Sequence, residues 1–268
     1  MGLQGLLGQV NCAQATARAR VKPAGDSMPV AARRSFTREE LDEVFPRPPL
    51  REVAFELRFP PRLRVQAENW RLQDQLVSDY PEVGKESAIQ ANGTILDVSV
   101  FNNPRESRVI KITHQNFLIA FTRYVKFEDF KAEVLARSEQ FCRTFGVEKF
   151  VRVGLRYVNE IGLPSNAPGA LLAYVRPVLK FDSFPIESID QFAVEIRSRL
   201  ENHWVTVRTA LIPGVLQTYV LDIDCHAEGP TDINDCRTLL DTFHQGAQYI
   251  FLDHITDEYK ALMRKTDG

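Results

Sequence analysis

The sequence predicts an α+β fold in which antiparallel meander sheets pack against two or three long helices. Stretches that alternate between apolar and polar residues occur in groups along the chain, as half-buried strands do. Each group is followed by a stretch with apolar residues at helical spacing. The regular strand-helix-strand alternation of a parallel sheet is absent. Because a strand group closed by a helix occurs twice, the order also favours two similar halves.

The first ordered element is expected to be a short helix. Thr37-Arg38-Glu39-Glu40 has capping-box spacing, and a proline-rich stretch from Pro46 ends the helix. Residues 1–34 precede it and carry five basic residues, one acid and no apolar period, so we expect a disordered extension. Residues 35–268 are expected to form one α+β unit, with two subdomains that meet near residue 148 as the alternative.

The first half should contain a strand, a helix, a meander and a second helix. Val53, Phe55, Leu57 and Phe59 alternate with polar or small residues before Pro60-Pro61 ends the strand. The further elements predicted for this half are a helix from about residue 66 to 80, strands over residues 95–101, 109–113 and 117–122, and a helix over residues 127–145.

The second half opens on a strand with two different faces. Val151, Val153, Leu155 and Tyr157 alternate toward one side, while Arg152, Arg156 and Glu160 point to the other. The further elements predicted for this half are strands over residues 171–181, 192–200, 204–212 and 216–226, and a C-terminal helix over residues 233–250 with a break near residue 256.

Composition and charge narrow the class of protein. The chain has 33 Lys and Arg against 35 Asp and Glu, so no strong net field attracts nucleic acid, and no nucleic-acid partner is expected. No apolar run approaches the roughly 20 residues that span a bilayer. The four cysteines form no CxxC pair, which favours a reducing cytoplasm. Neither a GxxxxGK[ST] nor a GxGxxG phosphate loop is present, and no cofactor is expected.

The strand with two faces offers a candidate ligand-binding site. Arg152 and Arg156, with Glu160, would form a polar sheet face that receives an anionic ligand, since a guanidinium binds carboxylate or phosphate in a bidentate manner. Asn159, near the end of the strand, would orient the ligand. The alternative is a lattice of ion pairs with neighbouring strands, for example with Glu52 or Glu56.

A weaker candidate is a metal site. Asp222, Asp224 and His226 share one face of a strand, and carboxylates with an imidazole at alternate positions are able to bind a divalent metal. The alternative is a solvated strand face opposite buried apolar residues. No HxH or HExxH motif is present, and no motif surrounds Cys142 or Cys236, so no catalytic residue is assigned.

Three phrases resemble a sporadically distributed prokaryotic family of uncharacterised proteins of similar length. The phrases are Pro49-Leu50-Arg51-Glu52-Val53-Ala54-Phe55-Glu56-Leu57-Arg58-Phe59, Leu155-Arg156-Tyr157-Val158-Asn159-Glu160-Ile161, and Phe251-Leu252-Asp253-His254-Ile255-Thr256-Asp257-Glu258. The resemblance implies a unit of this size and a patchy occurrence, with no reaction and no functional residues to transfer.

The function expected from the sequence is a binding or interaction module without catalytic turnover. Its partner would be an unknown protein or a small ligand, and self-association stays open. The alternative is an enzyme or a ligand-sensing domain with a pocket between the sheet and the C-terminal helix.

Overall fold

The computed structural model describes residues 34–89, 93, 95–124, 126–167, 169–177, 185, 188–200 and 203–265. The described residues from Phe36 onward belong to one compact unit. The predicted disordered extension, residues 1–34, lies outside the described residues apart from Arg34.

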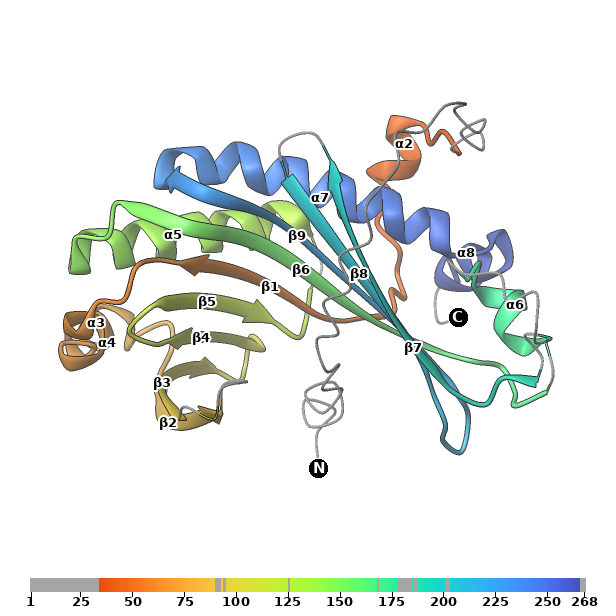
Figure 1. Ribbon diagram of the computed structural model, residues 1–268, viewed down its shortest axis with the longest axis horizontal. Helices are drawn as coiled ribbons and strands as arrows, with labels where there is room; N and C mark the ends of the chain where they lie inside the picture. Colours follow the sequence, from red (N-terminus) through yellow and green to blue (C-terminus); the bar gives the residue numbers. More distant parts are fainter. Residues whose placement is uncertain are drawn as a thin grey trace, which may run out of the picture. The chain divides into compact units, whose positions relative to one another are not determined.

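In the described part of the chain, nine strands form one sheet in the order β2-β3-β4-β5-β1-β6-β9-β8-β7 (Figure 1). Each strand is antiparallel to its neighbours. The strands are β1 (Leu50–Arg58), β2 (Glu82–Ile89), β3 (Ile95–Asn103), β4 (Arg108–Ile112), β5 (Asn116–Phe121), β6 (Lys149–Gly162), β7 (Phe192–Leu200), β8 (His203–Ile212) and β9 (Thr218–Asp232). The protein is therefore an α+β protein with an antiparallel sheet.

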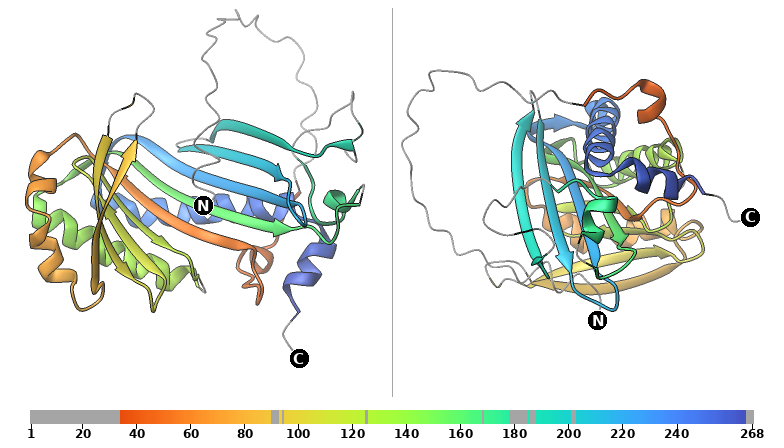
Figure 2. Two further views of the ribbon diagram at one scale, coloured as in Figure 1. Left: turned by 90° about the horizontal axis from the view of Figure 1, so that it is seen from below. Right: turned by 90° about the vertical axis from the view of Figure 1, so that its right-hand side faces the viewer.

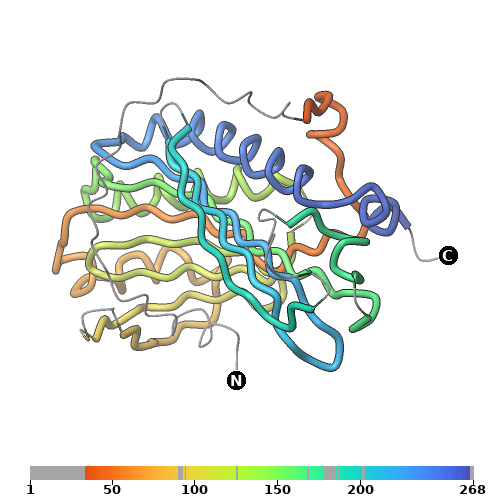
Figure 3. The backbone as a smooth tube through the Cα atoms, turned by 45° about the vertical axis from the view of Figure 1, so that its right-hand side comes forward, coloured from red at the N-terminus to blue at the C-terminus, as the bar shows by residue number. Residues whose placement is uncertain are grey.

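Helices α5 and α7 lie side by side against one face of the sheet (Figures 1 and 2). The helices are α2 (Arg38–Leu41), α3 (Leu63–Ala67), α4 (Trp70–Leu76), α5 (Phe127–Phe145), α6 (Ala170–Tyr174), α7 (Cys236–His254) and α8 (Asp257–Met263). Strand β6 pairs with β1 on one side and β9 on the other, so the sheet continues without a break across residue 148 (Figure 3).

The apolar stripe of α5 explains how this helix docks on the sheet. Phe130, Val134 and Phe141 follow helical spacing and are all buried. Phe141 stacks on Phe117 of β5, with ring centroids 4.5 Å apart. The helix ends at Gly146, whose φ of 64° is the left-handed conformation that glycine adopts without steric cost.

The register of the central strands gives the sheet two chemically different faces. Phe55, Leu155 and Cys225 lie opposite one another on β1, β6 and β9, and directly paired residues project to the same side. We call this side, which α5 and α7 cover, the helix face. The other side carries Arg152 and Arg156, and we call it the polar face.

Two helical assignments differ from the sequence prediction. The helix predicted over residues 66–80 is wrong, because two short helices, α3 and α4, occupy this region with a turn between them. In that turn Asn69 donates a hydrogen bond from Nδ2 to Oγ of Ser99 at 2.5 Å, which fixes the turn against β3. The strand predicted over residues 171–181 is also wrong, since α6 covers its start; residues 178–181 lie outside the described residues.

The observed strands differ from the predicted ones at two places. β2 was not predicted, because as an edge strand it is exposed along its whole length and shows no alternation of buried residues. β9 continues to Asp232, six residues beyond the predicted end at residue 226. It passes through Gly229, whose φ of 112° is accessible mainly to glycine.

Candidate functional site

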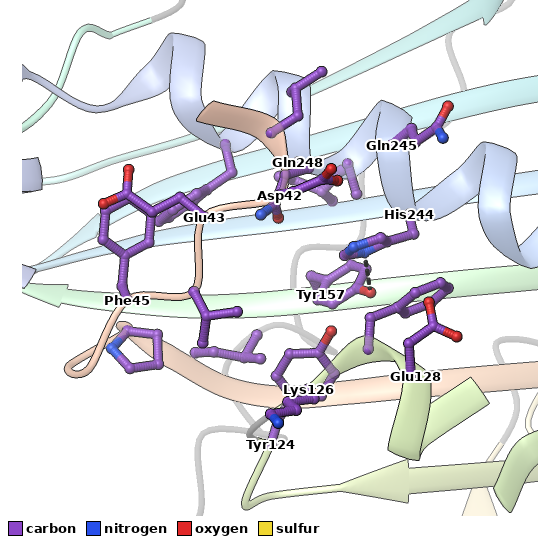
Figure 4. Close-up of a pocket in the computed structure, with 18 of the residues that line it drawn as sticks. Asp42, Glu43, Phe45, Tyr124, Lys126, Glu128, Tyr157, His244, Gln245 and Gln248 are labelled. Carbon is purple, nitrogen blue, oxygen red and sulfur yellow. Dashed lines mark hydrogen bonds between the residues drawn. The ribbon is translucent and has the colours of Figure 1, made fainter. Parts of the chain in front are cut away.

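A cavity of about 670 Å³ lies on the helix face of the sheet. Its walls come from β6, from α7, from the start of α5 and from the segment that runs from α2 into β1 (Figure 4). A cavity of this size holds a small ligand, and a space between a sheet and its helices is a common place for such a site.

The floor of the pocket is formed by Tyr157 and Asn159, which alternate along β6 and therefore point to the same side. Asn159 is only 5% exposed. Its Nδ2 donates a hydrogen bond to the backbone oxygen of Leu221 at 3.2 Å, while its Oδ1 accepts no hydrogen bond from the residues that the structure describes. The pocket floor therefore offers an unpaired acceptor on a buried residue.

His244 projects from α7 toward the floor (Figure 4). Its Nδ1 lies 2.9 Å from the hydroxyl of Tyr157, and its ring stacks on Phe127 at a centroid distance of 3.8 Å and an interplanar angle of 9°. Burial lowers the pKa of His244 to about 4. The imidazole is therefore neutral near pH 7, so one ring nitrogen donates a hydrogen bond and the other accepts one.

Several charged residues of the wall are paired within the protein. Lys131 donates a hydrogen bond to Asp241 at 2.5 Å. Glu43 accepts two hydrogen bonds from Arg264, the residue that follows α8, with N···O distances of 2.6 and 2.7 Å. The pair between Glu43 and Arg264 also connects the segment that follows α2 to the C-terminal part of the chain.

The structure places Arg152 and Arg156 on the polar face, away from this pocket. Arg152 binds Glu56 of β1 and donates from Nη2 to both oxygens of Asp224 on β9 at 2.7 Å. Arg156 makes a bidentate pair with Asp222 at 2.8 Å. The predicted lattice between strands is therefore confirmed at Glu56, and the two aspartates complete it.

The predicted ligand site on this strand is divided between the two faces of the sheet. Asn159 lies on the helix face, whereas Arg152, Arg156 and Glu160 belong to the alternate positions that project to the polar face. Asn159 is therefore not in place to orient a ligand bound by the arginines. A ligand-binding role for Arg152 and Arg156 stays a prediction.

Asp222, Asp224 and His226 share the polar face of β9, as the sequence predicts. The expectation that this face is solvated is wrong, because Asp222 is 1% and His226 4% exposed under the long side chains of neighbouring arginines. Burial also lowers the pKa of His226. Among the described residues, no group of three or more His, Cys, Asp and Glu side chains is arranged to hold a metal ion.

The thiols singled out in the sequence are not activated. Burial raises the pKa of Cys142 and of Cys236 to about 12, so both stay protonated near pH 7 and are poor nucleophiles. The pair of Tyr157 and His244 was not predicted as a site, because the two residues are 87 positions apart in the sequence and only the packing of α7 brings them together.

Comparisons of the chain with protein-family models and with curated proteins give no match. The family resemblance of the three phrases therefore stays a prediction. Within the described part of the chain, no helix is both long enough and apolar enough to cross a membrane.

The lowered pKa of His244 predicts that the protein loses stability in mild acid. In the unfolded chain the imidazole of His244 is protonated below its usual pKa of 6.5, whereas in the folded protein it stays neutral down to about pH 4. The free energy of unfolding therefore falls as the pH drops between these two values. Between about pH 7 and about pH 5 the wild type should lose about 2 kcal/mol more than His244→Asn. Urea unfolding at both pH values measures the difference, and equal losses would contradict the assignment.

Proposed function

We propose that the protein is a binding module for a small ligand, without catalytic turnover, and that the ligand occupies the pocket between β6 and α7. The observation that carries this proposal is the cavity of about 670 Å³ with the buried Asn159 on its floor. The proposal combines the two functions expected from the sequence. A binding module without turnover was the first, and a pocket between the sheet and the C-terminal helix belonged to the alternative.

Two features of the pocket support binding over catalysis. His244, with a pKa of about 4, is a weak base near pH 7, whereas an efficient general base has a pKa near the working pH. Burial also raises the pKa of Tyr157 well above its usual value, so its hydroxyl is a poor proton donor to a substrate. Both groups are better suited to making hydrogen bonds than to transferring protons.

The remaining expectations are kept as parts of this proposal. Two similar halves are supported by the strand pairing, because β5 pairs with β1 as β9 pairs with β6, and a helix follows each of these returning strands. A cytoplasmic location is supported by the free thiols of Cys142, Cys225 and Cys236. Membership of the resembling prokaryotic family is proposed on its three phrases.

Native mass spectrometry of the protein purified gently from its own host tests the binding function. We expect a discrete small added mass on the wild type and its loss in Gln248→Trp, because Gln248 lies in the pocket wall and an indole there fills the cavity. Gln73→Trp is the matched control, since Gln73 lies on α4 and outside the pocket, and it should retain the added mass. Bare wild-type protein, or an added mass that survives in Gln248→Trp, would contradict the proposal.

A further inference from the structure

We infer that the ligand of this pocket is an uncharged planar ring compound that carries both a hydrogen-bond donor and an acceptor on its edge. The inference rests on the proposed function and names the class of ligand. Three properties of the pocket lead to this inference. Its charged residues are paired, the polar groups of its interior are uncharged, and its walls contain several aromatic rings.

The paired charges exclude a strongly charged ligand. Lys131 is bound to Asp241, and Glu43 is bound to Arg264, so neither pair is free to neutralise an ion that enters. A buried charge without a partner costs several kcal/mol. Arg38 and Asp42, which also line the pocket, pair with each other at 3.4 Å. Lys126 and Glu128 are exposed, and their opposite charges favour neither sign of ligand.

The polar groups inside the pocket are uncharged and keep unused hydrogen-bond donors or acceptors. Oδ1 of the buried Asn159 offers an acceptor, and the neutral ring of His244 offers the nitrogen that does not face Tyr157. The side-chain amide of Gln248 makes no hydrogen bond with the described residues and supplies both a donor and an acceptor. A ligand with a donor and an acceptor on one edge forms hydrogen bonds with these groups and leaves none of them unpaired when it covers them.

The apolar parts of the wall are flat. Phe127 and His244 form a parallel stack, and Tyr124 meets Tyr157 edge to face with ring centroids 6.1 Å apart. Phe251 of α7 adds a further ring to the lining. Aromatic surfaces pack best against other planar rings, in offset-stacked or edge-to-face geometry. The aromatic rings of the wall therefore favour a planar ring as the ligand. The paired charges and uncharged polar groups favour an uncharged one.

Three probes of nearly equal size and shape test the charge preference: benzamide, benzoate and benzamidine. Their affinities are measured by titration of isotope-labelled protein, followed by the backbone amide signals of residues that line the pocket. We expect benzamide to bind at least tenfold more tightly than benzoate and benzamidine. The shifted signals should include those of Asn159 and Gln248.

Two substitutions should change this preference in a defined direction. Asn159→Asp places a carboxylate on the pocket floor with almost no change in shape, so benzamidine should become the tightest of the three probes. Because Asn159 is buried and the variant is at risk of misfolding, Gln248→Glu at the half-buried wall tests the same reversal. Gln73→Glu on α4 adds the same charge outside the pocket and should leave the order of the probes unchanged.

The outcomes separate this inference from the proposed function. Tighter binding of benzoate or benzamidine to the wild type, with shifts confined to the pocket, would overturn the inference and leave the binding function standing. No reversal in either pocket variant would likewise contradict the role of the uncharged groups. If none of the three probes shifts the pocket signals, both the inference and the proposed function fail.

Discussion

Replacing Arg152 with Met should lower the free energy of unfolding by about 3 kcal/mol, because it removes the arginine partner of Asp224 and leaves Glu56 with Arg58 alone among its arginines. The side chains of Arg152, Glu56 and Asp224 are only 14%, 15% and 13% exposed. Methionine preserves much of the length and apolar volume of the arginine but none of its donors. Urea denaturation measures the loss.

Lys111→Met provides the control for an ion pair of the same sheet that is more open to water. Lys111 binds Glu86 at 2.7 Å, but the two side chains are 29% and 54% exposed, so the loss should stay below about 1 kcal/mol. Similar losses in the two variants would show that burial does not set the contribution of these pairs.

Gly154 explains how Arg152 reaches its two partners. A Cβ atom at this position would lie 2.5 Å from Nη1 of Arg152, so the glycine leaves the space in which the guanidinium lies flat against the sheet. From there the guanidinium reaches β1 on one side and β9 on the other. The lattice thus joins three central strands.

Replacing Phe141 with Ala should lower the free energy of unfolding by about 3 to 5 kcal/mol. Phe141 is fully buried where α5 crosses the sheet, and its ring contacts Phe59, Phe117 and Phe145 at centroid distances of 5.4, 4.5 and 5.2 Å. The substitution removes the aromatic surface and leaves a cavity that these rings fill only in part. Thermal and urea unfolding report the loss.

Leu63→Ala is the matched apolar control. Leu63 is exposed at the start of α3, so its truncation should change the free energy of unfolding by no more than about 0.5 kcal/mol. A loss at Phe141 no larger than this would mean that the aromatic cluster does not hold α5 on the sheet.

Much of the fold could be predicted because, in its central elements, the apolar residues that recur at helical or strand spacing are also the buried ones. Phe130, Phe141 and Phe145 of α5 and Val153, Leu155 and Tyr157 of β6 are buried as predicted. The prediction is wrong for Val151, which is 49% exposed beside a register shift between Phe150 and Arg152. The prediction failed where burial does not follow a period. β2 is exposed on both sides, and α6 spans only a few residues between longer elements.

The candidate site could be predicted only in part. Sequence reasoning expected a pocket between the sheet and the C-terminal helix, and it selected Asn159, but it grouped this residue with arginines of the opposite face. The partners of those arginines were partly foreseen in Glu56. The contact between Tyr157 and His244 carried no signal, because the two residues are 87 positions apart and no local pattern links them.

The sequence by itself determined which apolar residues are buried along elements with a clear period, such as α5 and β6, because apolar side chains that repeat at the period of a helix or strand lie on one side of it. Only the tertiary structure decided which strands are neighbours and therefore which charges are neutralised. It set Asp222 and Asp224 of β9 beside the arginines of β6, and His244 of α7 above Tyr157. Such contacts depend on distances in space between segments far apart in the chain, which no local pattern encodes.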